Sequence, residues 1–231
     1  MPVRKIPPNR RSMTGRLVCH RLGCSLDYES QLEKDCLLLF SADPAVASIE
    51  VQPVRILYRH VDARGHLRVR KYTPDILVSF HPRLRRPPLL VEVKLRAVLE
   101  TKLEELMPKI RAGIGYARQR DWRFKVYTEK RIQQDNRILL RNIKYLRPRL
   151  REPRDSAASR LLLSAVFNQG RTTAAALLEE CGGTDVEQVR RLIPCLWRLI
   201  AACEINADLS SRFLSFDTPI WPGDSPGLAE K

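Results

Sequence analysis

Long apolar runs are missing from this sequence: no stretch approaches the roughly 18 consecutive apolar residues that a membrane-spanning helix needs. The basic opening segment, MPVRKIPPNRRSMTGR, also lacks the apolar core of a secretory signal. Hydrophobic residues make up 44% of the chain and charged residues 29%, which excludes a wholly disordered chain and a membrane protein. We therefore expect a folded, cytoplasmic protein whose 231 residues form one large domain or two smaller ones.

Paired cysteines are missing as well. The six cysteines form no C-x-x-C pair and no set of four ligands, so neither a zinc site nor a disulfide framework is indicated. Cys19, His20 and Cys24 lie close together in the sequence, but a fourth metal ligand is absent. We expect all six thiols to be reduced and mostly packed.

Acidic residues are scarce in the first two-thirds of the chain. Residues 1–154 contain 34 Lys/Arg and only 16 Asp/Glu, a net charge of +18, whereas residues 155–231 contain 7 and 10. An imbalance of this size is typical of nucleic-acid-binding domains, because cations neutralise phosphates. The first two-thirds are therefore predicted to bind nucleic acid, and the last third to have another role.

Composition and patterning divide the chain into three segments. Residues 1–24 contain no acidic residue, and we expect an arm without fixed structure that either follows DNA phosphates or remains a solvated tail. Residues 25–147 mix helical and strand patterns, which predicts an α/β domain with a sheet flanked by helices. Residues 148–231 begin with the linker-like PRLREP and then predict three helices and a hairpin, a small winged-helix-like domain. Its negative charge favours docking to a protein at least as much as reading a DNA groove.

The most informative stretch runs from Thr73 to Lys94. Two short apolar runs bounded by prolines predict two β-strands, one starting after Pro74-Asp75 and one ending in Glu92-Val93-Lys94. Side chains two residues apart on a strand share a face, so Glu92 and Lys94 point the same way. If the two strands pair, Asp75 comes to the same end of the sheet.

That grouping has a chemical use. Two carboxylates and a backbone carbonyl, here that of Val93, suit a hard cation such as Mg²⁺. The cation polarises a phosphoryl oxygen and activates a water, while a lysine stabilises charge that develops on phosphorus. A surface salt bridge between Glu92 and Lys94 also explains a bare E-x-K triplet, but the upstream Pro-Asp and the hairpin favour a nuclease.

A third carboxylate is available from a predicted helix over residues 25–40. Ser25 or Asp27 is the expected N-cap, and Glu29 and Glu33 lie one turn apart on one face. Either Glu33 faces the sheet and joins the site, or both glutamates are exposed. Periodicity alone favours exposure.

The remaining patterns predict further elements in chain order. They are an outer strand over residues 46–61 with a kink or edge at Gln52-Pro53, a hairpin connection at 62–65, a strand over 66–72, a helix over 97–120 kinked at Pro108, a strand over 122–128, and a helix over 129–146.

Four motifs in this order resemble the N-terminal catalytic domain of TnsA, the endonuclease subunit family of heteromeric transposases. They are YESQLEKDCLLLF, SIEVQPVRI, KYTPDILV and LLVEVK, and the resemblance covers about residues 25–146. It implies a restriction-endonuclease-like fold of the PD-(D/E)xK class that uses Mg²⁺ or Mn²⁺. It also implies that Asp75 and Glu92 bind the metal, that Lys94 is the catalytic lysine, and that Glu33 is the helix carboxylate, with Glu29 as second choice. Some family members have Gln at the position of Glu92.

The resemblance further implies cleavage of double-stranded DNA at the 5′ ends of a transposon during excision. A DDE-type transposase, TnsB, then cuts the 3′ ends, and an AAA+ regulator, TnsC, is bound through the C-terminal domain. Gln52-Pro53 matches a family motif without an assigned role. Two other functions stay open: a non-catalytic DNA-binding adaptor with a nuclease-like fold, and a stand-alone restriction or junction-resolving nuclease.

Overall fold

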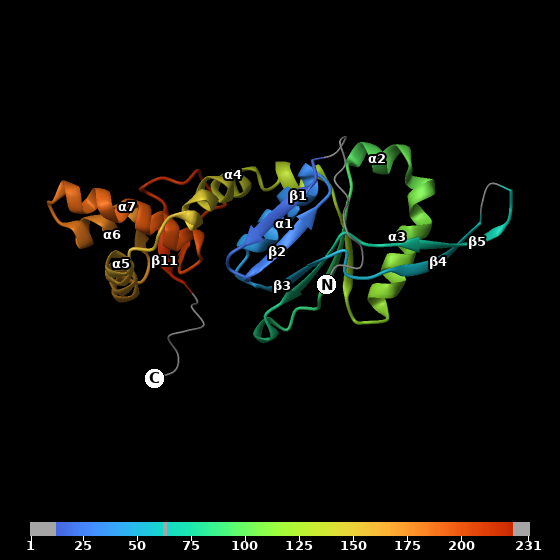
Figure 1. The fold of residues 1–231 in the computed structure, drawn as a ribbon, viewed down its shortest axis with the longest axis horizontal. Helices are drawn as coiled ribbons and strands as arrows, with labels where there is room; N and C mark the ends of the chain where they lie inside the picture. Colours follow the sequence, from blue (N-terminus) through green and yellow to red (C-terminus); the bar gives the residue numbers. More distant parts are fainter. Residues whose placement is uncertain (1–12, 62–63, 224–231) are drawn as a thin grey trace. The chain divides into compact units, whose positions relative to one another are not determined.

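A computed structural model describes residues 13–61 and 64–223 of the chain (Figure 1). The chain forms two compact units that divide between Asp135 and Asn136. Within the described residues, no helix is both long and apolar enough to cross a membrane.

The first unit is built on a mixed four-stranded sheet with the order β3-β6-β7-β8. β6 pairs antiparallel with β3 and β7, whereas β7 and β8 run parallel. The elements are β1 (Gly15–Cys19), β2 (Cys24–Tyr28), α1 (Gln31–Ala42), β3 (Val46–Val51), β4 (Ile56–Val61), β5 (Leu67–Tyr72), β6 (Ile76–Phe80), a 3-10 turn (Pro82–Leu84), β7 (Leu89–Val93), α2 (Arg96–Thr101), α3 (Leu103–Arg118), β8 (Arg123–Tyr127) and a π-helical turn (Lys130–Gln134).

The two central strands are buried on both faces, which explains their continuous apolar runs. Leu77 and Leu90 pack with Ala117 of α3 on one face, while Ile76 and Val91, which point to the other face, are also fully buried. α1 packs against β3 and β7. The α/β prediction with a mixed sheet flanked by helices is confirmed.

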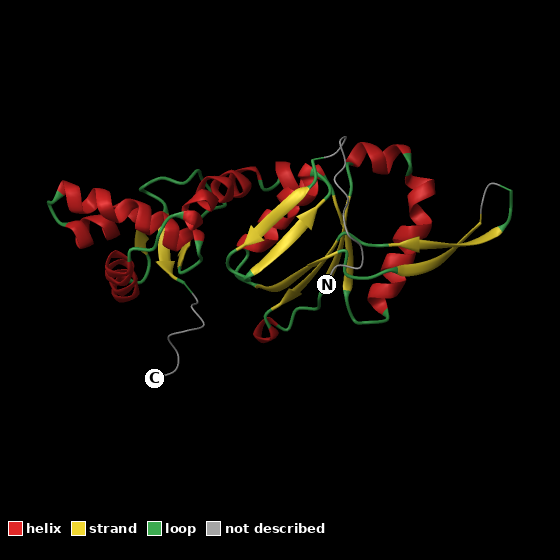
Figure 2. Ribbon diagram, in the orientation of Figure 1, coloured by secondary structure: helices red, strands yellow, loops and turns green. Residues whose placement is uncertain are grey.

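The prediction of an arm without fixed structure over residues 1–24 is wrong for the part that the structure describes. β1 and β2 form an antiparallel hairpin, drawn as a pair of strands in Figure 2. Its alternate side chains Leu17, Cys19, Leu26 and Tyr28 are buried, and this period of two was present in the sequence. Residues 1–12 of the predicted arm lie outside the described residues.

Helix α1 begins later than predicted, because Ser30 rather than Ser25 or Asp27 is its N-cap. The Ser30 hydroxyl accepts a hydrogen bond from the Glu33 N–H at 3.1 Å, and the Glu33 carboxylate accepts one from the N–H of Glu29 at 2.8 Å. This is a variant of the capping box. Glu29 precedes the helix, so the prediction that Glu29 and Glu33 share a helical face is wrong.

Three predicted elements are divided in the structure. The strand over residues 46–61 becomes β3 and β4 in separate sheets, with Gln52 in the left-handed region at φ 49° between them. The helix over 97–120 is interrupted at Lys102, whereas Pro108 lies inside α3. The helix over 129–146 breaks at the division between the two units.

The second unit therefore includes a helix that the sequence assigned to the first. Its elements are α4 (Arg137–Leu146), a 3-10 turn (Arg147–Arg151), α5 (Ser156–Gln169), β9 (Thr172–Thr173), α6 (Ala174–Gly182), α7 (Val186–Ala201), β10 (Ile205–Ala207) and β11 (Pro219–Pro222). The strands form an antiparallel sheet with the order β10-β11-β9.

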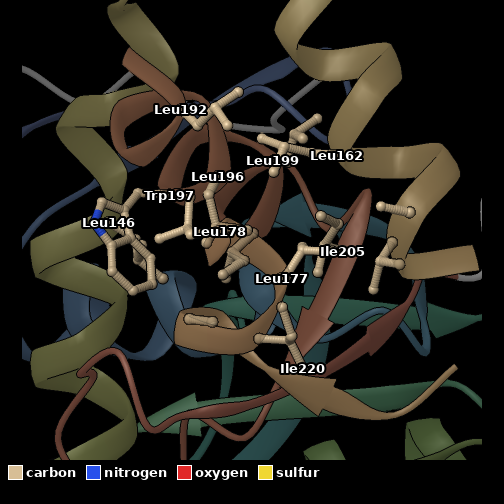
Figure 3. Packing of buried hydrophobic residues seen from close by; sticks show 14 residues of the cluster. Leu146, Leu162, Leu177, Leu178, Leu192, Leu196, Trp197, Leu199, Ile205 and Ile220 are labelled. Atoms are coloured by element: carbon tan, nitrogen blue, oxygen red, sulfur yellow. The ribbon is translucent and has the colours of Figure 1, made fainter. Parts of the chain in front are cut away.

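Buried contacts explain why α4 belongs to this unit. Leu146 lies in the core cluster that Figure 3 shows, together with Leu196 and Trp197 of α7. The buried Asn142 amide donates to the carbonyls of Leu209 and Arg212 at 2.9 and 2.8 Å. Apolar periodicity showed that α4 has a buried face, but it carried no information about which core covers that face.

Candidate active site

The pairing of β6 with β7 brings the predicted carboxylates together. Ile76 pairs with Val91, and one step further along this antiparallel register Asp75 lies opposite Glu92. The N–H of Val93 donates to Oδ2 of Asp75 at 2.6 Å. Both acidic residues therefore lie at the same end of the sheet, as the hairpin predicted.

The Lys94 ammonium lies among the oxygens of this group. Its Nζ is 3.0 Å from Oε1 of Glu92 and 3.9 Å from Oδ2 of Asp75, and it donates to the carbonyl of Val93 at 2.9 Å. Three of the four predicted metal ligands thus surround one cation.

Glu92 is the most buried charged group of the site, with only 2% of its side chain exposed. Its Oε1 also pairs with Nζ of Lys109 at 2.9 Å, and its Oε2 accepts a hydrogen bond from the Tyr72 hydroxyl at 2.7 Å. A buried carboxylate is tolerated only when it is paired and hydrogen-bonded. Lys109 comes from α3 and Tyr72 from the end of β5, and sequence analysis missed both.

Burial and neighbouring charges shift the pKa values of three residues of the site. Burial and the neighbouring Glu92 raise the pKa of Asp75 to about 8, although Lys94 opposes this shift. Burial alone would lower the pKa of Lys94, but Asp75 and Glu92 together outweigh that effect and raise it. Burial and Glu92 also raise the pKa of Tyr72, so its hydroxyl stays a hydrogen-bond donor at every physiological pH.

Glu33 interacts electrostatically with this group, but its carboxylate caps the N-terminus of helix α1. Burial is the largest cause that raises the pKa of Glu33, while Lys94 lowers it, and its charge contributes to the raised pKa of Asp75. Its two oxygens accept from the Glu29 N–H and, at 3.1 Å, from the Ser30 hydroxyl. The predicted role of Glu33 as a metal ligand stays a prediction.

Glu29, the second choice for the helix carboxylate, contacts Gln52 instead. Its Oε1 accepts a hydrogen bond from Nε2 of Gln52 at 2.9 Å. The Gln52 N–H in turn donates to the carbonyl of Asp75 at 2.8 Å. The Gln-Pro motif thus ties the segment before α1 to the start of β6, which is a positioning role that the sequence did not reveal.

The residues fit a hard divalent cation. Asp75, Glu92 and the Val93 carbonyl offer oxygen donors only, the pKa of Asp75 is raised by burial and by the neighbouring Glu92, and a cation already stands among the three. In the part of the chain that the structure describes, no three His, Cys, Asp or Glu side chains are grouped closely enough to hold a metal by themselves. The carbonyl and water molecules would therefore have to complete the coordination.

Replacing Tyr72 by Phe is expected to lower the free energy of unfolding by about 1.5–3 kcal/mol, because a buried charge loses a hydrogen bond. Unfolding of the first unit is followed by the fluorescence of Trp122 in urea, with Trp197 and Trp221 of the second unit replaced by Phe. Tyr58→Phe is the matched control, since Tyr58 is a half-buried tyrosine of the same ribbon, whereas the hydroxyl that donates to Glu92 is that of Tyr72. If Tyr72→Phe and Tyr58→Phe lower the free energy of unfolding equally, the Tyr72–Glu92 hydrogen bond makes no specific contribution to stability.

The sheet and the site define a class: an α/β domain that fits the restriction-endonuclease-like fold, with two carboxylates and a lysine at the end of neighbouring strands. Residues 43–129 match the family described as TnsA-like endonuclease N terminal. The chain therefore carries a TnsA-like endonuclease domain, and the resemblance stated from the four motifs is confirmed. A comparison with curated proteins found no match.

The matched residues include Asp75, Glu92 and Lys94 but begin after Glu33. They end before the division between the two units. The match supports a nuclease of the transposase type, with DNA as substrate and a heteromeric transposase as its setting.

Proposed function

We propose that this protein is a Mg²⁺-dependent DNA endonuclease subunit of a heteromeric transposase, which cuts the 5′ strands at the transposon ends during excision. The single observation that carries the proposal is the convergence of Asp75, Glu92 and the Val93 carbonyl on one cation, the Lys94 ammonium. Mn²⁺ suits the same oxygen donors.

Each residue has a separate task in this proposal. Asp75, Glu92 and the Val93 carbonyl would hold the metal, which when bound polarises a phosphoryl oxygen and lowers the pKa of a water. Lys94 places a positive charge beside the carboxylates, where charge develops on the phosphate in the transition state. Lys109 pairs with the buried Glu92 carboxylate and so gives it a second cationic partner besides Lys94.

Glu33 has the weakest support. Its carboxylate is electrostatically coupled to Asp75 and Lys94, which fits a role at the edge of the site. We propose that it orients a water molecule or joins the metal shell after giving up one of its capping bonds. Glu29 is less suited, because Gln52 holds its carboxylate.

The second unit is proposed to be a winged-helix-like docking domain. Its order of α5, β9, α6, α7, β10 and β11, with one three-stranded antiparallel sheet, supports this assignment. Residues 155–231 carry 7 basic and 10 acidic residues, which disfavours contact with DNA. We propose that this unit docks on the regulator TnsC, and that TnsB completes the complex at the DNA ends.

A strand-resolved cleavage assay tests the proposal. The protein, TnsB and TnsC are mixed with DNA that bears transposon ends, in Mg²⁺, in Mn²⁺ or in a chelator. We expect 5′-strand nicks with either metal, none with the chelator, and none from Asp75→Ala, whereas Glu50→Ala, an exposed carboxylate on β3, should cut normally.

Equal nicking by wild type and Asp75→Ala would contradict the proposal. DNA binding without cleavage by any form would indicate the non-catalytic adaptor. Cleavage without TnsB and TnsC would indicate a stand-alone nuclease.

A further inference from the structure

Strands β4 and β5 form a ribbon that belongs to no other sheet in the described residues. They pair over six residues each, from Ile56–Tyr72 to Val61–Leu67. Figure 1 shows the ribbon extending past α3, away from the central sheet. The metal site makes no use of its outer part.

The surface of this ribbon is unusual in two respects. Its two strands contain four Lys/Arg and no Asp/Glu: Arg59, Arg68, Arg70 and Lys71. Its large aliphatic side chains are mostly exposed: Leu57 at 63%, Val61 at 57%, Leu67 at 60% and Val69 at 69%. The antiparallel register puts these four on one face, together with Arg59 and Lys71. An exposed apolar face of this kind marks an interaction site.

The base of the ribbon is fixed to the active site. Ile56 and Tyr72 are buried against α3 and the sheet, and the Tyr72 hydroxyl donates to Glu92 at 2.7 Å. Asp75 follows Tyr72 by three residues. A molecule bound along the ribbon is therefore held in a defined position relative to the carboxylates.

The dimensions and charge of the ribbon suit double-stranded DNA. Two paired strands lie about 4.8 Å apart, and six residues extend about 20 Å. The major groove is about 12 Å wide and admits a two-stranded ribbon, with aliphatic side chains against thymine methyl groups and cations against phosphates. The ribbon of a second copy would bring a surface with the same positive charge, which disfavours pairing of two ribbons.

We propose that the β4–β5 ribbon is a DNA-binding arm that enters the major groove next to the cleavage site. This inference rests on the proposed function only in assuming that DNA is the substrate. Arg59 and Arg70, on opposite faces of the ribbon, contact phosphates, while Leu57 and Val69 contact base edges.

The test is a titration of a labelled 30-base-pair duplex, followed by fluorescence anisotropy in Ca²⁺ at several salt concentrations. The double variant Arg59→Gln/Arg70→Gln is expected to bind on the order of tenfold more weakly near 0.1 M salt. The slope of log K against log salt should fall by about 1.8, or about 0.9 for each lost phosphate contact. Arg160→Gln/Arg191→Gln removes the same charge from exposed positions of the second unit and should leave affinity and slope unchanged.

Two further variants keep this proposal apart from the proposed function. Asp75→Ala should bind DNA like wild type while failing to cut it, and failure to cut by wild type would leave the binding result standing. Leu57→Ser/Val69→Ser should weaken binding without changing the molar mass in sedimentation. Wild-type affinity and slope in the Arg variant would overturn the proposal, as would a Ser variant that only turns a dimer into a monomer.

Discussion

Replacing Glu92 by Leu is expected to lower the free energy of unfolding of the first unit by about 3–5 kcal/mol and to abolish cleavage. Glu92 is the shared partner of Lys94 at 3.0 Å and Lys109 at 2.9 Å, and Tyr72 donates to it. Without this carboxylate, two ammonium groups are left close together without their partner. A buried pair that loses one member is strongly destabilised, because the remaining charge keeps its desolvation penalty.

Urea unfolding followed by Trp122 fluorescence measures this effect, and the strand-resolved assay measures cleavage. Glu92→Gln provides the graded comparison, because its amide oxygen still accepts a hydrogen bond and the resemblance allows Gln at this position. We expect Glu92→Gln to lose less stability and less activity than Glu92→Leu. Wild-type stability in Glu92→Leu would show that the two lysines do not depend on this carboxylate.

Replacing Asp75 by Asn is expected to abolish cleavage too, yet to change stability in the opposite direction. The pKa of Asp75 is raised from 3.8 to about 8 in the folded protein, chiefly by burial and by Glu92. Between these two values the folded state holds a proton that the unfolded state has lost, so wild-type stability falls as the pH rises from about 4 to about 8. Asn carries no charge at any pH, so Asp75→Asn should be the more stable form by a few kcal/mol at pH 8.

The comparison is made by thermal and urea unfolding in chelator at pH 4, 6 and 8. The difference between Asp75→Asn and wild type should be smallest near pH 4, where the folded wild type is protonated at Asp75 and the unfolded chain is only about half ionised there. Added Mg²⁺ should stabilise the wild type at pH 8 and leave Asp75→Asn unchanged, because the proposed metal site needs the Asp75 carboxylate. A difference that does not depend on pH would contradict the raised pKa of Asp75.

The two carboxylates of the site are expected to have opposite effects on stability: Glu92 stabilises the folded protein, whereas Asp75 destabilises it above pH 4. Glu92 has its charge offset by two lysines and holds parts of β7, α3 and β5 together. Among the described residues, the Asp75 carboxylate contacts the N–H of Val93 and, at 3.9 Å, the Lys94 ammonium, so less of its charge is offset, and the proposed metal ion would offset the rest. Stability is expected to be sacrificed at functional positions of this kind.

Patterns along the chain predicted the core of the site because it depends on neighbouring strands. The alternation of side chains put Glu92 and Lys94 on one face, and a hairpin of two apolar runs required Asp75 to return to the same end. Those relations follow from strand geometry and need no knowledge of the remaining fold.

Contacts between segments that are distant in the sequence could not be predicted from such local patterns. Tyr72, Lys109 and the pair of Glu29 with Gln52 are joined across 20, 17 and 23 residues of chain. The spacing of residues along α3 does not distinguish Lys109 from an exposed lysine, because its partner, Glu92, lies on strand β7. The assignment of Glu29 to a helical face failed because Ser25, Asp27 and Ser30 are all good N-caps, and only packing selects one.

The sequence by itself determined that a basic α/β domain carries Asp75, Glu92 and Lys94 on paired strands, since periodicity, charge and a short hairpin are local properties. Only the tertiary structure decided that Lys109 and Tyr72 complete the site, that α4 belongs to the second unit, and that the β4–β5 ribbon stands apart from the sheet. The physical reason is that a pattern of apolar and charged residues states which face is buried, whereas packing between distant segments states what buries it.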